Sequence, residues 1–255
     1  MARSPTKLAL LLFPLLFPLR SLHAKTLTVA VIDTGIDRAL PHLCKEGHRS
    51  FTGDDDDPLV DDHGHGTHIA GLIVANAGDG DYCLVSLRYY KRSNTGTQNL
   101  HNMVKALEYA ININVDLINI SGGGPKPNAA ERTLVKKALA RGITIVTAAG
   151  NDDQDLGLDC YYYPACYDER IIVVGNLQAV VDLSDEDEVA RSIMEEGGLQ
   201  FEPAKSSNYG SRVSRWEVGT DVLSTLPGGK MGRMSGTSQA CAVATGKLVK
   251  QRLGR

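Results

Sequence analysis

Residues 27–35 read Leu-Thr-Val-Ala-Val-Ile-Asp-Thr-Gly, an apolar run that ends in an aspartate and a turn. Successive apolar residues are typical of a strand that is buried on both faces of a parallel sheet. In α/β proteins, sites lie at the carboxyl ends of such strands. The run therefore predicts a buried strand that presents Asp33 at this edge, although an aspartate in a strand-end turn is also common without any function.

The rest of the chain alternates between strand and helix patterns. Further apolar runs predict strands at residues 84–89, 115–120, 143–148 and 171–174, and helical spacing marks residues 67–75, 100–111 and 129–140. This alternation predicts an α/β fold: a three-layer, doubly wound, mostly parallel sheet with helices on both faces. With 255 residues, 42% of them hydrophobic, the chain can bury one sizeable core, so one domain is expected.

The N-terminus has the pattern of a secretory signal peptide. Arg3 and Lys7 form a basic start, residues 8–19 are almost all apolar, and Ala24 offers a small residue for cleavage. The apolar run is shorter than the ~20 residues that a membrane-spanning helix needs, so an uncleaved anchor is less favoured. We therefore expect residues 1–24 to be removed and residues 25–255 to form a secreted or periplasmic domain with no membrane segment.

Charge argues against nucleic acid as a partner. Removal of residues 1–24 leaves 24 basic against 30 acidic side chains, a net charge of −6. The basic residues of the C-terminal tail fit the solvated face of a helix. The acidic and polar stretch at residues 182–203 is expected to be a surface insertion.

Five cysteines follow the expected cleavage site, in an oxidising compartment if the leader is a signal peptide. Because the number is odd, at least one stays free or pairs between chains. Cys241 lies in an apolar helical stretch, where a buried free thiol is ordinary. The favoured pairs are then Cys160 with Cys166 and Cys44 with Cys83, but the sequence does not decide the connectivity.

Two further motifs supply a histidine and a serine. His65 lies in Gly64-His65-Gly66-Thr67-His68, and Ser238 lies in Gly236-Thr237-Ser238-Gln239-Ala240 at the start of an expected helix. Asp33, His65 and Ser238 are the groups that nucleophilic acyl transfer needs: a nucleophile, a base that takes its proton, and a carboxylate that orients the base.

Each of these residues also has an ordinary structural explanation. A serine at this position can simply cap the helix. His63, His65 and His68 suggest a zinc site, but their spacing fits neither His-Glu-x-x-His nor a Cys/His pattern. We expect His68 to be a structural, hydrogen-bonded residue of its helix.

Asn151 follows an apolar run in Ala148-Ala149-Gly150-Asn151. Its side-chain amide is a candidate oxyanion donor, opposite the backbone N–H of Ser238. Without the other three residues, a turn asparagine after a glycine would be the simpler interpretation.

The order Asp, His, Ser, with these flanking residues, resembles the subtilisin-like serine proteases (subtilases) from about residue 28 to residue 246. The resemblance implies that Asp33 orients the base, His65 is general base and then acid, Ser238 is the nucleophile and Asn151 completes the oxyanion hole. The implied reaction is endopeptide hydrolysis through an acyl-enzyme.

The same resemblance implies how a substrate binds. The segment Ser121-Gly122-Gly123 is similar to the family's edge that pairs with an extended polypeptide, and a strand end near residues 93–96, at Gly96, would form the opposite wall. Tyr163-Pro164-Ala165 resembles a family turn that often contains a cis-proline. Tyr162 stands where the family often has a small residue at the pocket floor, which predicts a short pocket and a preference for small side chains on the acyl side of the cut.

Departures from the family pattern keep a second hypothesis open. No propeptide is visible after the expected signal peptide, Ala242 replaces a usual proline, and the chain ends soon after Ser238. A separate folding partner or inhibitor is therefore one expectation. The alternative is a catalytically silent pseudoenzyme or peptide-binding protein with the same fold.

No cofactor is expected, and calcium is the one alternative left open, although its usual site looks lost. Family members often bind calcium between a loop after the aspartate and a loop after the histidine helix. Here His42 occupies the position of a usual aspartate, and the second loop is compressed to residues 76–81. Cys44 and Cys83 fall beside these loops, so a disulfide is expected to replace the calcium.

Overall fold

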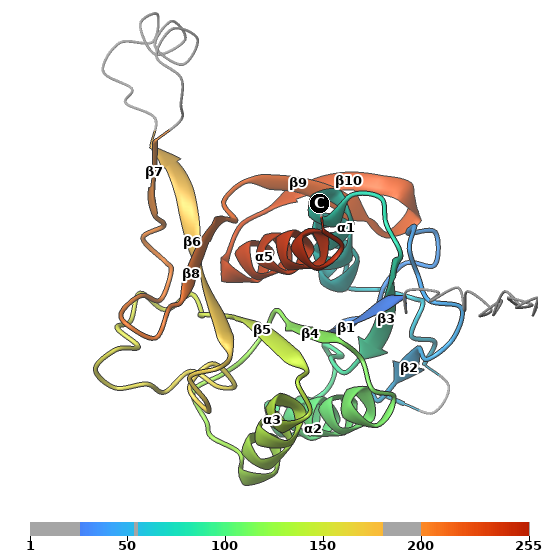
Figure 1. The fold of residues 1–255 in the computed structure, drawn as a ribbon, viewed down its shortest axis with the longest axis horizontal. Helices are drawn as coiled ribbons and strands as arrows, with labels where there is room; N and C mark the ends of the chain where they lie inside the picture. Colours follow the sequence, from blue (N-terminus) through green and yellow to red (C-terminus); the bar gives the residue numbers. More distant parts are fainter. Residues whose placement is uncertain (1–25, 54–55, 181–199, 255) are drawn as a thin grey trace, which may run out of the picture.

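The computed structural model describes residues 26–53, 56–180 and 200–254. Its centre is a sheet with eight strands in these residues, in the order β2–β3–β1–β4–β5–β6–β7, with β8 paired to β6 as well (Figure 1). Neighbouring strands are parallel except β6 and β7. The strands are β1 (Leu27–Asp33), β2 (Arg49–Ser50), β3 (Tyr82–Arg88), β4 (Leu117–Ile120), β5 (Thr144–Ala148), β6 (Ile172–Val180), β7 (Gln200–Pro203) and β8 (Arg215–Val218).

Helices cover both faces of the sheet. α2 (Gly96–Asn112) and α3 (Ala129–Ala140) lie on one face, and α1 (His65–Ala77) and α5 (Thr237–Arg252) on the other (Figure 1). Each face has its own buried apolar cluster, because the strands present apolar residues to both sides. The predicted three-layer, doubly wound α/β architecture is thereby confirmed.

One expected element was wrong. Residues 93–96 are not a strand end, since β3 ends at Arg88 and Gly96 is the first residue of α2. A capping box explains the early helix start: the Thr95 side chain accepts from the N–H of Gln98, and the Gln98 side chain accepts from the N–H of Thr95. The Thr95 and Gln98 side chains thus accept from backbone N–H groups that have no carbonyl partner at the start of a helix.

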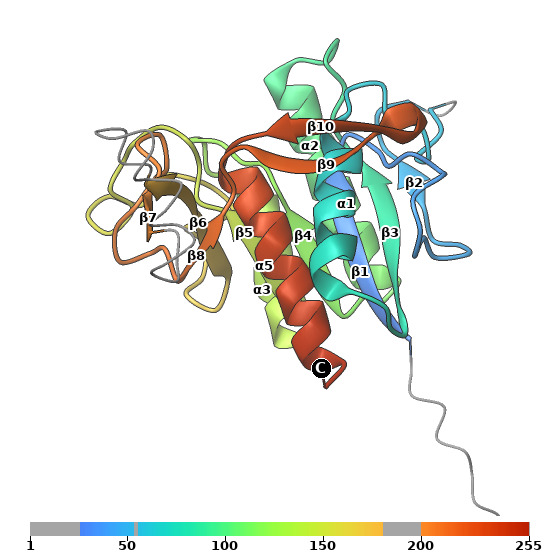
Figure 2. The same cartoon turned by 90° about the horizontal axis from the view of Figure 1, so that it is seen from above.

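A hairpin covers the start of α1. Its strands are β9 (Val222–Leu226) and β10 (Lys230–Met234), joined by the 3₁₀ turn Pro227–Gly229 (Figure 2). The ring of His68 lies 3.2 Å from the carbonyl oxygen of Gly232, measured from Nε2. The Ser224 hydroxyl donates to the carbonyl oxygen of His68. His68 is therefore a hydrogen-bonded structural residue, as expected.

Disulfides join Cys44 to Cys83 and Cys160 to Cys166, and Cys241 is free and buried, in agreement with the favoured pairing. The expected signal peptide lies outside the described residues. Of the expected acidic insertion, only residues 200–203 are described, and they form β7 against the outer end of β6 (Figure 1). In the described part of the chain, no helix is long and apolar enough to cross a membrane.

Candidate active site

Asp33 and His65 meet at the carboxyl edge of the sheet. Asp33 is the last residue of β1 and His65 is the first of α1, and His65 Nδ1 lies 2.7 Å from Asp33 Oδ1. The approach requires glycine at position 66, because a Cβ there would lie 2.1 Å from the carbonyl oxygen of Gly35. The glycines of the histidine motif thus let the start of α1 pack against the turn after β1.

The environment of His65 favours its charged form. Burial works against the imidazolium, but the charge of Asp33 and its hydrogen bond, together with the charge of Asp61, raise the pKa of His65 above its ordinary value. A carboxylate that accepts from Nδ1–H also leaves Nε2 of a neutral ring as the proton acceptor. This arrangement suits a general base.

Ser238 is the second residue of α5 and is held against the Ser121 segment. Its hydroxyl donates to the carbonyl oxygen of Ser121 at 2.6 Å, and the Ser121 hydroxyl donates to the carbonyl oxygen of Ser238 at 3.1 Å. Ser121 lines a small cavity of about 160 Å³ together with Asp33 and His65. Ser238 is therefore hydrogen-bonded to a residue that lines this cavity, and its hydroxyl donates to Ser121 and not to His65.

Asn151 lies beside the same helix start. Its Oδ1 accepts from the backbone N–H of Thr237 at 2.9 Å, which fixes which end of the amide faces α5. The amide nitrogen is then left for another acceptor. The backbone N–H of Ser238, in the first turn of α5, has no carbonyl one turn earlier to bond. These two groups are the donors expected of an oxyanion hole.

Tyr162 fills the space between two glycines. A Cβ on Gly123 would lie 2.7 Å from Cε1 of Tyr162, and a Cβ on Gly150 would lie 2.8 Å from Cε2, on the opposite edge of the ring. Burial, with Asp152 and Cys241 nearby, raises the pKa of the Tyr162 hydroxyl to about 12. The peptide bond between Tyr163 and Pro164 is cis. The ring thus separates the Ser121–Gly123 segment from the Gly150–Asn151 turn.

A larger cavity continues the site along the sheet edge. It measures about 540 Å³ and lies between the start of α2, including Gly96, and the segment from Gly123 to Lys126. Tyr89, Tyr90 and Met103 contribute to its walls. Gly96 and Gly123 therefore line the same cavity, and Gly96 belongs to a helix start and not to a strand end. Gly122 packs against Tyr89: a Cβ at position 122 would lie 2.9 Å from the Tyr89 hydroxyl oxygen.

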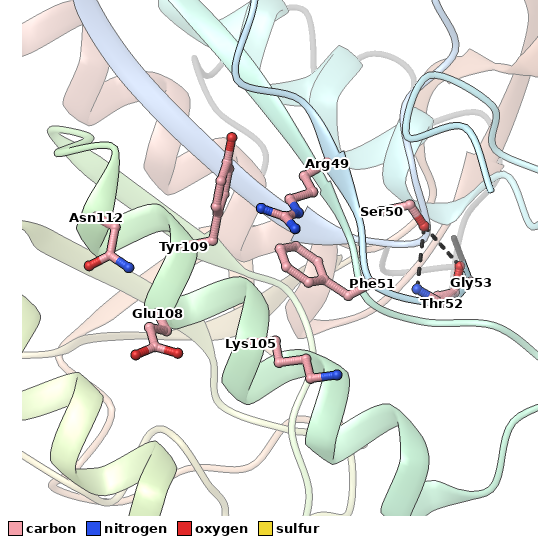
Figure 3. Close-up of a pocket in the computed structure, with 9 residues that line it drawn as sticks. All are labelled: Arg49, Ser50, Phe51, Thr52, Gly53, Lys105, Glu108, Tyr109 and Asn112. Atoms are coloured by element: carbon pink, nitrogen blue, oxygen red, sulfur yellow. Dashed lines mark hydrogen bonds between the residues drawn. The ribbon is translucent and has the colours of Figure 1, made fainter. Parts of the chain in front are cut away.

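Another cavity, of about 420 Å³, lies between β2 and α2 and shares no residue with the site. In it the Arg49 guanidinium lies over the rings of Phe51 and Tyr109, 5.7 Å and 5.1 Å from their centroids (Figure 3). None of the described residues that line it is a histidine or a cysteine. The zinc hypothesis gains no support either, because the described residues contain no group of three or more His, Cys, Asp or Glu side chains placed to hold a metal ion.

Two buried polar residues received no role of their own from the sequence. Asp61 accepts hydrogen bonds from both segments that carry Asp33 and His65. Asn119 on β4 donates to the Ser121 hydroxyl and accepts from Thr245 on α5. Asn119 could have been noticed as a polar residue within an apolar strand. Asp61 lies among several acidic residues, and its position alone does not distinguish it.

Comparisons with known proteins point to one family. A family model described as the subtilase family matches residues 24–252. The chain is 33% identical over 241 residues to the Major intracellular serine protease of Bacillus subtilis (strain 168), covering 90% of this chain and 69% of that protein. It is 35% identical over 217 residues to Subtilisin E of the same organism, covering 83% of this chain but only 51% of the relative. A crystal structure of a cold adapted subtilisin-like serine proteinase superposes with a TM-score of 0.66 at 26% identity, over 89% of this chain and 76% of that one.

Proposed function

The chain belongs to the subtilase family of serine endopeptidases, and we propose that it hydrolyses peptide bonds through an acyl-enzyme on Ser238. The observation that carries the proposal is the hydrogen-bonded pair of Asp33 and His65, in a cavity also lined by Ser121, the hydrogen-bond partner of Ser238. In this mechanism His65 Nε2 takes the proton of Ser238 as Oγ attacks the substrate carbonyl. His65 then gives this proton to the leaving amine, and water releases the acyl group.

Negative charge on the attacked oxygen would be stabilised by the Asn151 amide and the Ser238 N–H. Both donors lie at the N-terminus of α5, where the aligned peptide dipoles also favour a negative charge. The nucleophile must first leave its bond to the Ser121 carbonyl. A rotation about its Cα–Cβ bond, between staggered rotamers, would release it.

A fluorophosphonate probe tests the nucleophile directly. We expect the folded protein, residues 25–255, to gain the mass of one adduct, and Ser238→Ala to gain none. A folded wild-type protein that gains no adduct would contradict the proposal. The bond between Ser238 and Ser121 would then favour the alternative, a silent peptide-binding protein in which the serine is only structural.

We further propose that the substrate is an extended polypeptide with a small side chain on the acyl side of the cut. The Ser121–Gly123 segment would pair with its backbone, and Gly96 would lie on the opposite wall of the groove. The support is the Tyr162 ring, whose opposite edges approach Gly123 and Gly150 and leave little room for a large side chain.

Tyr162→Gly tests this specificity. The variant should raise kcat/KM for a substrate with Phe before the cut, relative to Ala, by about 10- to 100-fold, because a large apolar side chain gains a buried site. Tyr161→Gly, the same change at the neighbouring position, should leave the ratio unchanged. Equal ratios for Tyr162→Gly and the wild type would contradict the specificity proposal.

We propose that the Cys44–Cys83 disulfide takes the structural place of the calcium that relatives often bind. The ring of His42, at the position of the usual aspartate, stacks on Tyr82 with centroids 4.4 Å apart and offers no carboxylate. Replacing both Cys44 and Cys83 by serine should lower the free energy of unfolding by about 2–4 kcal/mol. The second disulfide closes a shorter loop, 6 against 39 residues, so its double serine variant should lose less. A fall in Tm on adding EDTA to the wild type would contradict the proposal.

We also propose that residues 1–24 direct secretion. Two disulfides fit an oxidising compartment, although two of the similar relatives are named intracellular proteases. Expression of the full chain should give a protein outside the cytoplasm whose N-terminus, by intact mass, is Lys25. A cytoplasmic product that keeps residues 1–24 would contradict this.

A further inference from the structure

Asp61 is a buried carboxylate for which the mechanism above has no role. It is 4% exposed and accepts five hydrogen bonds. The donors are the Thr34 hydroxyl at 2.8 Å, the backbone N–H of His63, Gly64 and Thr67 at 3.2, 2.8 and 2.8 Å, and the Thr67 hydroxyl at 2.7 Å. Three of these bonds go to Oδ1 and two to Oδ2, so both oxygens of the buried carboxylate have partners.

The two oxygens of Asp61 join the segments that carry the acid–base pair. Oδ1 accepts from Thr34, the residue after Asp33, and from the N–H of Gly64, the residue before His65. Oδ2 accepts from Thr67 in the first turn of α1. The Thr34 hydroxyl also accepts from the N–H of Gly66 at 2.8 Å. A rotation of α1 relative to β1 would therefore break several of these bonds together.

Asp61 also supplies the capping acceptor that the start of α1 lacks. The N-cap residue is Gly64, which has no side chain to accept from the first-turn N–H groups. The Asp61 carboxylate accepts from the N–H of Gly64 and of Thr67 in its place. Its negative charge at a helix N-terminus is favourable. The start of α1, and with it the position of His65, thus depends on a residue three positions before the helix cap.

The other acidic residues nearby are bound elsewhere. The Asp62 side chain is 67% exposed and pairs with Arg88, and Asp57 pairs with Arg38 at the surface. Asp56 pairs with Lys91. None of these three carboxylates bonds to a residue of the Asp33 turn or of the first turn of α1. Among the acidic residues of this loop that the structure describes, Asp61 is the one that bonds to these two segments.

We propose that Asp61 is a positioning residue for the acid–base pair: it holds the Asp33 turn and the first turn of α1 in register and adds negative charge beside the His65 imidazolium. The proposal rests on the proposed function of Asp33 and His65. Among the described residues, the other titratable groups around His65 are Asp33 on β1, His63 on the preceding loop, Tyr89 and Tyr90 after β3, and His68 within α1. The two carboxylates whose charge raises the pKa of His65 are Asp33 and Asp61.

Asp61→Asn is the direct test, because Asn keeps one acceptor oxygen but loses the charge and the acceptor for Thr67. We expect kcat/KM to fall by about 10- to 100-fold, mostly in kcat, as for the loss of a hydrogen bond to a charged group. The pKa of His65, followed by NMR of its ring, should fall. Asp62→Asn, the same change at the exposed neighbour, should leave kcat and the pKa of His65 unchanged. A folded Asp61→Asn variant with an unchanged His65 pKa and kcat would overturn the proposal.

A second pair of variants serves if Asp61→Asn does not fold. Thr34→Val removes the hydroxyl that links Asp61 to Gly66, whereas Thr34→Ser keeps it. We expect Thr34→Val to lower kcat and Thr34→Ser to retain it; equal kcat values in the two folded variants would overturn the proposal. The NMR measurement needs no turnover. A protein with no activity at all would therefore reject the proposed function while the His65 pKa still tests Asp61.

Discussion

The acid–base half and the nucleophile half of the site are held in different ways. Asp33 and His65 bond directly to each other, and Asp61 ties together the segments that carry them. Ser238 instead exchanges two hydrogen bonds with Ser121, and its hydroxyl donates to the Ser121 carbonyl and not to His65. The base is thus arranged before substrate binds, whereas the nucleophile has one rotation to make. The difference shows that the fold fixes the geometry of the acid–base pair directly, whereas it holds the nucleophile through a separate segment.

Removal of a central group from either half should have the largest effect. We expect Ser238→Ala and His65→Ala to lower kcat by about 10⁶-fold and Asp33→Asn by about 10⁴-fold, as for the catalytic groups of serine proteases. The double variant Ser238→Ala/His65→Ala should be no slower than either single variant, because the two groups act as one unit. Turnover of a peptide substrate by each purified variant provides the measurement. If the fold-losses in kcat of the two single variants multiplied in the double variant, Ser238 and His65 would act independently and not as one unit.

Substitutions of Asn151 test the proposed oxyanion donors at the start of α5. Asn151→Asp keeps an oxygen for the Thr237 N–H but loses the amide donor, and we expect kcat to fall by about 10²- to 10³-fold with little change in KM. Asn151→Ala should lose a similar factor. Steady-state kinetics on one substrate separates the two parameters. If KM rose and kcat did not change, Asn151 would be a binding residue and not an oxyanion donor.

The pH dependence of kcat/KM should report on the acid–base half alone, because that half contains the titrating base His65 and the nucleophile half does not. The neutral form of His65 is the base, so kcat/KM should rise as the pH passes the raised pKa of His65, above the ordinary value of about 6.5. For stability the sign is opposite. A raised pKa in the folded state stabilises the protein fully below the unfolded value, and this contribution is lost as the pH rises through the folded value.

The measurements are a pH–rate profile and unfolding titrations across the same range. Asp33→Asn should move the acid limb of the profile to lower pH and remove this part of the pH-dependent stability. An acid limb that stays in place in Asp33→Asn would show that another group controls it.

The two halves also differ in how much the sequence reveals. The strand before Asp33 and the helix after His65 follow from apolar patterns and glycines, and the structure confirms both elements. The expected strand end at Gly96 was wrong because the local capping box formed by Thr95 and Gln98 starts a helix there. The role of Asp61 depends on contacts between distant segments, which a run of acidic residues cannot reveal. The direction of the Ser238 hydroxyl is a choice of rotamer, which no sequence pattern encodes.

Ser121→Ala should have the smallest effect of these changes. It removes the hydroxyl that donates to the Ser238 carbonyl and accepts from Asn119, but it keeps the backbone carbonyl that holds the Ser238 hydroxyl. One neutral hydrogen bond is worth about 0.5–1.5 kcal/mol, so we expect kcat to fall by about 2- to 10-fold. The rate of fluorophosphonate labelling measures the reactivity of Ser238 without the later steps. A loss as large as that of Asp33→Asn would mean that the nucleophile half is held as strictly as the acid–base half.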